Sequence, residues 1–159
     1  METKVIPERM SRRVVDLAVV HTEDQEVLLI AEVTLKADEG KKLQALGHAH
    51  RLQAPYAMVV DPSEIRLYEV NGQEGFSQST IVLNTEEVIR AYDPEIDKNW
   101  LNERYLSSLI MSWLYDLIER WEHTTPPGDK QLAAAGLDRD RWRRCVVYSE
   151  VRVGDREGG

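Results

Sequence analysis

Two acidic residues lie inside stretches of the chain that are otherwise apolar. Asp16 interrupts the run 14–20, and Glu32 lies near the end of the run 27–35. A carboxylate inside an apolar strand is unfavourable unless a neighbour compensates its charge. If the two runs form neighbouring strands, a divalent cation bound by both carboxylates is the obvious compensator, since Mg²⁺ and Mn²⁺ take such oxygen ligands. We therefore take Asp16 and Glu32 as candidate metal ligands and candidate catalytic residues.

Two further polar residues share a face with Glu32 if its strand continues to residue 36. Side chains two apart in a strand point to the same side, so Glu32, Thr34 and Lys36 would project together. A lysine beside a bound metal can orient or deprotonate an attacking water, or stabilise a pentavalent phosphate. This set suits the hydrolysis of a phosphodiester. The plainer alternatives are a solvated Lys36 at the strand end and a Thr34 that merely favours a strand.

A polar pair follows on the next predicted element. Residues 41–52 have apolar side chains at helical spacing, and Gln44 and His48 lie four apart on one face of that helix. We expect them to contact a phosphate or to hold the site together, although surface helices often carry such pairs. Lys41 and Lys42, at the start of the helix, are alternatives to the strand lysine.

The elements that must position these residues follow the order strand, strand, helix, strand, strand. The predicted strands cover 14–20, 27–35, 56–60 and 65–70, and the last ends in a turn at Asn71-Gly72. The first two read as a β-hairpin, and the second is apolar enough to be central in its sheet.

The second half of the chain is mostly helical in pattern. Apolar residues recur with a 3.6-residue period over 98–122, which predicts a long amphipathic helix. The remaining predictions are short helices over 5–12, 85–92 (capped by Thr85) and 131–135, an edge strand over 145–151, and a disordered tail over 153–159.

Composition is that of a globular protein. With 159 residues, 42% hydrophobic and 30% charged, the chain is most simply one domain over 1–152. A single cysteine, Cys145, excludes an internal disulfide and leaves a cysteine-based zinc site short of ligands, which fits a cytoplasmic protein. The N-terminus does not read as a signal peptide, and no apolar run approaches the roughly 20 residues of a membrane span.

Charge is unevenly distributed. The net charge of −8 argues against nucleic acid as a partner, because phosphate binding rests on lysine and arginine. However, residues 14–35 hold five acidic and no basic residues, whereas 36–51 hold four basic and two acidic ones. A metal site beside a phosphate-holding helix would have this distribution, and so would an ordinary domain with uneven charges.

The segment 10–72 resembles the PD-(D/E)xK nuclease superfamily, which has the restriction-endonuclease-like fold. It is most similar to the nuclease region of type I restriction enzyme motor subunits. The matching positions are Asp16, then Glu32-Val33-Thr34, then Gln44-Ala-Leu-Gly-His48. Two positions depart from the family pattern, because Thr34 replaces its lysine and His48 its tyrosine. Lys36, or Lys41 or Lys42, is then the candidate for a displaced lysine.

The resemblance implies an α/β domain with a mixed sheet flanked by helices, and the apolar period over 98–122 adds a long C-terminal amphipathic helix. It also implies a nuclease that hydrolyses DNA with Mg²⁺ or Mn²⁺. The alternative is an inactive domain of the same fold that serves DNA binding or protein assembly, including docking to a protein partner. The apolar stripe over 98–122, with Trp100, Trp113 and Trp121, further predicts a homodimer through this helix.

Overall fold

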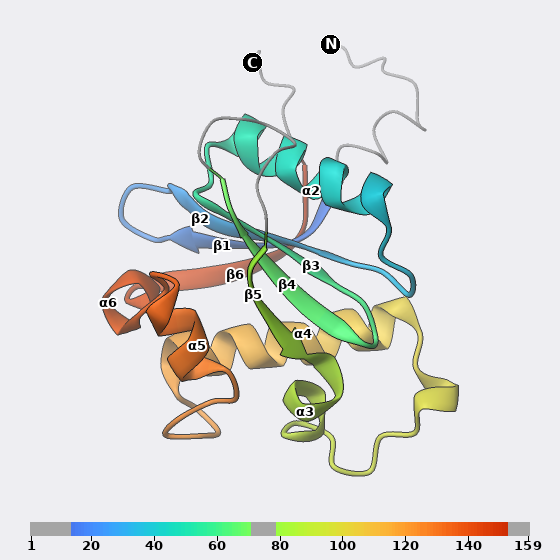
Figure 1. Ribbon diagram of the computed structural model, residues 1–159. Helices are drawn as coiled ribbons and strands as arrows, with labels where there is room; N and C mark the ends of the chain where they lie inside the picture. Colours follow the sequence, from blue (N-terminus) through green and yellow to red (C-terminus); the bar gives the residue numbers. More distant parts are fainter. Residues whose placement is uncertain (1–13, 71–78, 153–159) are drawn as a thin grey trace.

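The computed structural model describes residues 14–70 and 79–152 and has a six-stranded mixed sheet flanked by helices (Figure 1). The strand order is β5-β4-β3-β2-β1-β6. The strands are β1 (Val14–His21), β2 (Val27–Val33), β3 (Tyr56–Val60), β4 (Glu64–Glu69), β5 (Ser79–Asn84) and β6 (Cys145–Arg152). Strands β2 and β3 are parallel, and every other neighbouring pair is antiparallel.

The helix α2 (Glu39–Leu52) connects the two parallel strands and covers one face of the sheet. Asp38 caps its first turn by accepting a hydrogen bond from the Lys41 N–H, and Gln53 ends it in the left-handed conformation. Its buried residues pack against the apolar side chains of β1, β2 and β3, which explains the apolar spacing of the helix.

The helix α4 (Glu103–Glu119) lies across the opposite face, together with α3 (Thr85–Arg90), α5 (Asp129–Ala134) and α6 (Arg139–Trp142) (Figure 1). Asn102 caps its first turn and Arg120 ends it in the left-handed conformation. The apolar stripe of α4 is buried within this one chain, with Trp113 fully buried.

The predicted helix over 98–122 therefore needs a correction. Lys98–Trp100 is a separate 3₁₀ turn, and the chain is extended at Leu101 and Asn102 before α4 begins. The helix also ends at Glu119, and α5, α6 and β6 follow it, so it is not the C-terminal element. The side chain of Asn102 competes for the first helical N–H groups, which is why the helix starts there.

Most of the other predicted elements are found. The hairpin, the helix after it and the strands β3 and β4 lie where the pattern placed them, and β6 is an edge strand. The strand β5 was not predicted. Asn84, not Thr85, caps α3, because the Thr85 hydroxyl donates instead to the Asp61 carbonyl.

Three predictions fall outside the described residues: the helix over 5–12, the turn at Asn71-Gly72 and the tail over 153–159. Within the described residues, no helix has the length and apolar character to cross a membrane.

Candidate functional site

The two candidate carboxylates lie where β1 and β2 separate. The last bonded pair at this end of the hairpin is Leu17 with Ala31, and Asp16 and Glu32 are the next residues of the two strands, beyond the paired region. The Asp16 Oδ2 accepts a hydrogen bond of 2.7 Å from the Val33 N–H. The Asp16 side chain thus replaces a backbone acceptor at the point where the ladder opens.

The environment of Asp16 disfavours its charge. Its pKa is raised from 3.8 to about 6, mainly because burial removes water from the carboxylate. Glu32 and Glu103 raise it further through their negative charge, whereas the Val33 N–H and Lys41 lower it. Asp16 is therefore a carboxylate that additional positive charge would stabilise.

Glu32 has a different neighbour. It is 2% exposed, and its Oε2 lies 2.9 Å from Nδ1 of His48 on α2. This contact joins the central strand to the helix that covers it. Because Glu32 already has this partner, its burial alone does not require a cation, and a metal would have to use the other carboxylate oxygen or displace the imidazole.

Thr34 and Lys36 do not continue the strand. Since β2 ends at Val33, the same-face argument that grouped them with Glu32 does not apply. Thr34 is buried, donates its N–H to the Val60 carbonyl at 2.9 Å, and accepts the Lys36 N–H on Oγ1 at 3.3 Å. Thr34 therefore shapes the turn into α2, and Lys36 is exposed at that turn.

The start of α2 provides a positive charge that acts on Asp16. Lys41 is partly buried, and its charge lowers the pKa of Asp16. Lys42 faces elsewhere, with its Nζ 3.8 Å from Glu39 and 5.5 Å from the centre of the Tyr68 ring. Gln44 is partly buried on the same helix. Of the three lysines considered from the sequence, Lys41 is thus the one that interacts with Asp16.

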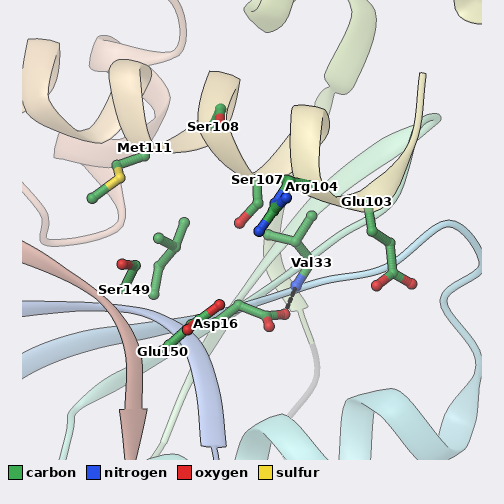
Figure 2. A pocket seen from close by; sticks show the side chains of 10 residues that line it. Asp16, Val33, Glu103, Arg104, Ser107, Ser108, Met111, Ser149 and Glu150 are labelled. Atoms are coloured by element: carbon green, nitrogen blue, oxygen red, sulfur yellow. Dashed lines mark hydrogen bonds between the residues drawn. The ribbon is translucent and has the colours of Figure 1, made fainter. Parts of the chain in front are cut away.

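Asp16 also lines a pocket of about 410 Å³ between the strands and α4 (Figure 2). Figure 2 shows the side chains of Glu103, Arg104 and Ser107 extending from α4 toward the strands. The full lining is Asp16, Leu17, Val33, Glu103, Arg104, Ser107, Ser108, Met111, Ser149 and Glu150. Of these residues, only Asp16 belongs to the predicted site.

A signal for the helical side of the pocket exists in the sequence. Glu103, Arg104, Ser107, Ser108 and Met111 repeat at helical spacing, on the side of α4 that its buried stripe does not occupy. The sequence pattern shows this polar face, but only the packing of α4 across the sheet shows that it faces Asp16.

The floor of the pocket is irregular. Val15 packs with the apolar cluster under α2, whereas Leu17, two residues on, packs with the cluster under α4. The strands β1 and β6 pair Val15 with Val151 and Leu17 with Ser149, but Asp16 and Glu150, which lie between these pairs, are not paired. Glu150 has a φ of 53°, a strained value for a residue with a side chain. The register is the same on both sides of the missing pair, so the ladder is interrupted here without a β-bulge.

The donors available for a metal are two carboxylates. In residues 14–70 and 79–152, no group of three or more His, Cys, Asp or Glu side chains is arranged to hold a metal ion. Two carboxylates still fit Mg²⁺, which keeps several waters and needs few protein ligands. Asp16 Oδ1 accepts no hydrogen bond from the described residues and is free for such a ligand role.

Comparisons of the chain with protein-family models, with curated proteins and with solved structures found no match.

Proposed function

We propose that this protein is a divalent-metal-dependent nuclease that hydrolyses DNA phosphodiester bonds, with Asp16 and Glu32 as the metal ligands. The observation that carries the proposal is the position of Asp16. It lies just beyond the paired part of the hairpin, burial and the charge of Glu32 raise its pKa, and it borders a pocket. A carboxylate whose pKa is strongly perturbed and that borders a cleft is a candidate for a functional site.

The topology supports a restriction-endonuclease-like fold as part of the proposal. A β-hairpin, a helix that covers it and a strand parallel to the second hairpin strand follow in the order that the resemblance implies. The acidic pair lies on the hairpin, and His48 and Gln44 lie on the helix, as in the motif.

Each residue then has a distinct role. The Asp16 and Glu32 carboxylates bind the cation, which when bound lowers the pKa of a water and neutralises charge on the phosphate. His48 holds the Glu32 side chain in one orientation through its 2.9 Å contact. Lys41 offsets the negative charge of Asp16 and is a better candidate than Lys36 for the lysine that assists the water. Gln44 lies on the same helix and would contact the phosphate.

A second candidate function is a non-catalytic domain of the same fold. The buried pair of Glu32 with His48 favours it, because a satisfied carboxylate has less need of a metal. The use of Thr34 as a turn residue also favours it, since the usual lysine position then carries no charge.

Metal binding separates the two. Calorimetric titration of the unmodified protein with Mn²⁺ or Mg²⁺ should show one metal site, and Asp16→Asn and Glu32→Gln should each remove it. The unmodified protein with bound metal should also cleave DNA. Lys130→Ala, an exposed residue on α5, is the matched control. If no metal binds and no DNA is cleaved, the non-catalytic function stands.

A further inference from the structure

The pocket beside Asp16 contains an arginine that has no partner among the described residues. Arg104 is exposed on the first turn of α4, next in sequence to Glu103, yet it forms no ion pair and no side-chain hydrogen bond with any described residue. An arginine presents five donors in a planar fork that matches the oxygens of a phosphate. Unpaired in a pocket, Arg104 is ready to bind an anionic group of a ligand.

The other walls combine hydroxyls with apolar surface. Ser107 on α4 and Ser149 on β6 supply hydroxyls that bond to no described residue, and Met111 and Leu17 supply apolar surface. Neutral donors and acceptors beside an apolar wall suit a sugar and a base. The volume of about 410 Å³ lies in the range of pockets that hold small ligands, roughly 300–1,000 Å³. A single nucleotide fits such a space, whereas a stretch of duplex does not.

We propose that this pocket is a subsite for one unpaired nucleotide of a single-stranded DNA, with Arg104 binding a phosphate next to Asp16. The inference rests on the proposed function and adds its substrate class. A paired nucleotide would have to leave the helical stack to enter, and this costs a few kcal/mol that an unpaired nucleotide does not spend. The site should therefore prefer single strands and frayed ends over blunt duplex.

Binding in this pocket should require a divalent cation. Asp16, Glu103 and Glu150 all line it, so its carboxylates outnumber its one arginine and repel a phosphate. A cation bound to Asp16 would offset the excess negative charge of the pocket, and Arg104 would then bind the phosphate from the side of α4. Glu150 lines the pocket beside Asp16, and its backbone φ is 53°.

Fluorescence anisotropy with a labelled oligothymidylate, and with the same strand in a blunt duplex, tests the proposal. Ca²⁺ replaces Mg²⁺ because it takes the same oxygen ligands. We expect the single strand to bind at least about tenfold more tightly than the duplex, and Arg104→Ala to remove about tenfold of this affinity. Arg139→Ala, an exposed arginine on α6, makes the same charge change away from the pocket and should have no effect.

A steric variant provides a second measurement. Ser107→Tyr should fill the pocket and abolish the preference for single strands without lowering the melting temperature, because Ser107 is only partly buried. Equal binding of the two DNA forms, or equal effects of Arg104→Ala and Arg139→Ala, would overturn the subsite.

A Ca²⁺ titration without DNA separates the two possible failures. Absence of metal binding would overturn the proposed function and the subsite with it. Metal binding without a preference for single strands would overturn the subsite alone.

Discussion

His48 Nδ1 lies 2.9 Å from Glu32 Oε2, and this contact ties the helix α2 to the central strand β2. Both side chains are almost completely buried, at 11% and 3% exposure. The pair is therefore both a structural link and part of the candidate metal site, and changes to it test both roles.

Removal of His48 should destabilise the protein. In His48→Ala the Glu32 carboxylate stays buried without this partner, which typically costs about 3–5 kcal/mol. Urea unfolding would measure the loss, with His50→Ala, exposed on the same helix, as the control. If Glu32 binds a metal, saturating Mn²⁺ should restore part of the stability. No recovery with Mn²⁺ would speak against Glu32 as a ligand.

Asp16 should make stability fall with rising pH. Its folded pKa of about 6 is above the ordinary 3.8, so the folded state binds more protons than the unfolded state between these values. The contribution is full below pH 3.8 and is lost as the pH rises through 6. Asp16→Asn should remove this slope and leave the protein more stable at pH 7 by roughly 1–2 kcal/mol, after allowance for solvent screening. Thermal unfolding from pH 4 to 7 measures the effect, and an unchanged slope would contradict the assignment.

Metal affinity should follow the same titration in the opposite direction. Protons compete with the cation for Asp16, so binding weakens as the pH falls below about 6. Calorimetry in buffers of different ionisation enthalpy would show the release of a proton on binding at pH 5.5 and little release at pH 7.5. A pH-independent affinity would point to ligands other than Asp16.

Substitution of Lys41 and substitution of Lys36 should have different effects on DNA cleavage. Lys41→Ala should slow DNA cleavage by at least about tenfold, because its charge acts on Asp16, and should leave the fold intact. Lys36→Ala should change the rate little, because Lys36 is exposed at the turn after β2. Single-turnover rates under saturating Mg²⁺ distinguish them. The reverse order would restore Lys36 as the catalytic lysine.

Asp116 provides a test of stability away from the site. It is fully buried on α4 and accepts hydrogen bonds from the Tyr92 hydroxyl at 2.6 Å, His123 Nδ1 at 2.7 Å and the N–H groups of Glu122 and His123. Asp116→Ala should cost about 3 kcal/mol or more, because several buried donors lose their acceptor. Asp140→Ala, at an exposed position on α6, should cost less than about 0.5 kcal/mol in the same chemical denaturation.

The homodimer stays a prediction, but its surface changes. The part of the stripe that lies on α4 is buried inside the chain, whereas Trp100 and Trp121 are exposed, as are Tyr105 and Tyr148. Light scattering at increasing concentration would detect a dimer, and Trp100→Ser should weaken it. A monomer at all concentrations would leave these aromatic residues as ordinary surface.

The sequence by itself determined the secondary-structure elements of the first half and the residues whose side chains could bind a metal or take part in catalysis. Period-two and period-3.6 patterns are local properties, so the hairpin, α2, β3 and β4 follow from them. The unusual context of Asp16 and Glu32 is also visible in the sequence, because each is a carboxylate within a run of apolar residues.

Only the tertiary structure decided how these residues are used. The strand β2 ends at Val33 because Thr34 closes the turn, and this removes Lys36 from the strand face. The interaction of Lys41 with Asp16, the pairing of His48 with Glu32, and the polar face of α4 over Asp16 all join residues far apart in the chain. Such contacts depend on how helices pack on the sheet, and no local pattern in the sequence contains that information.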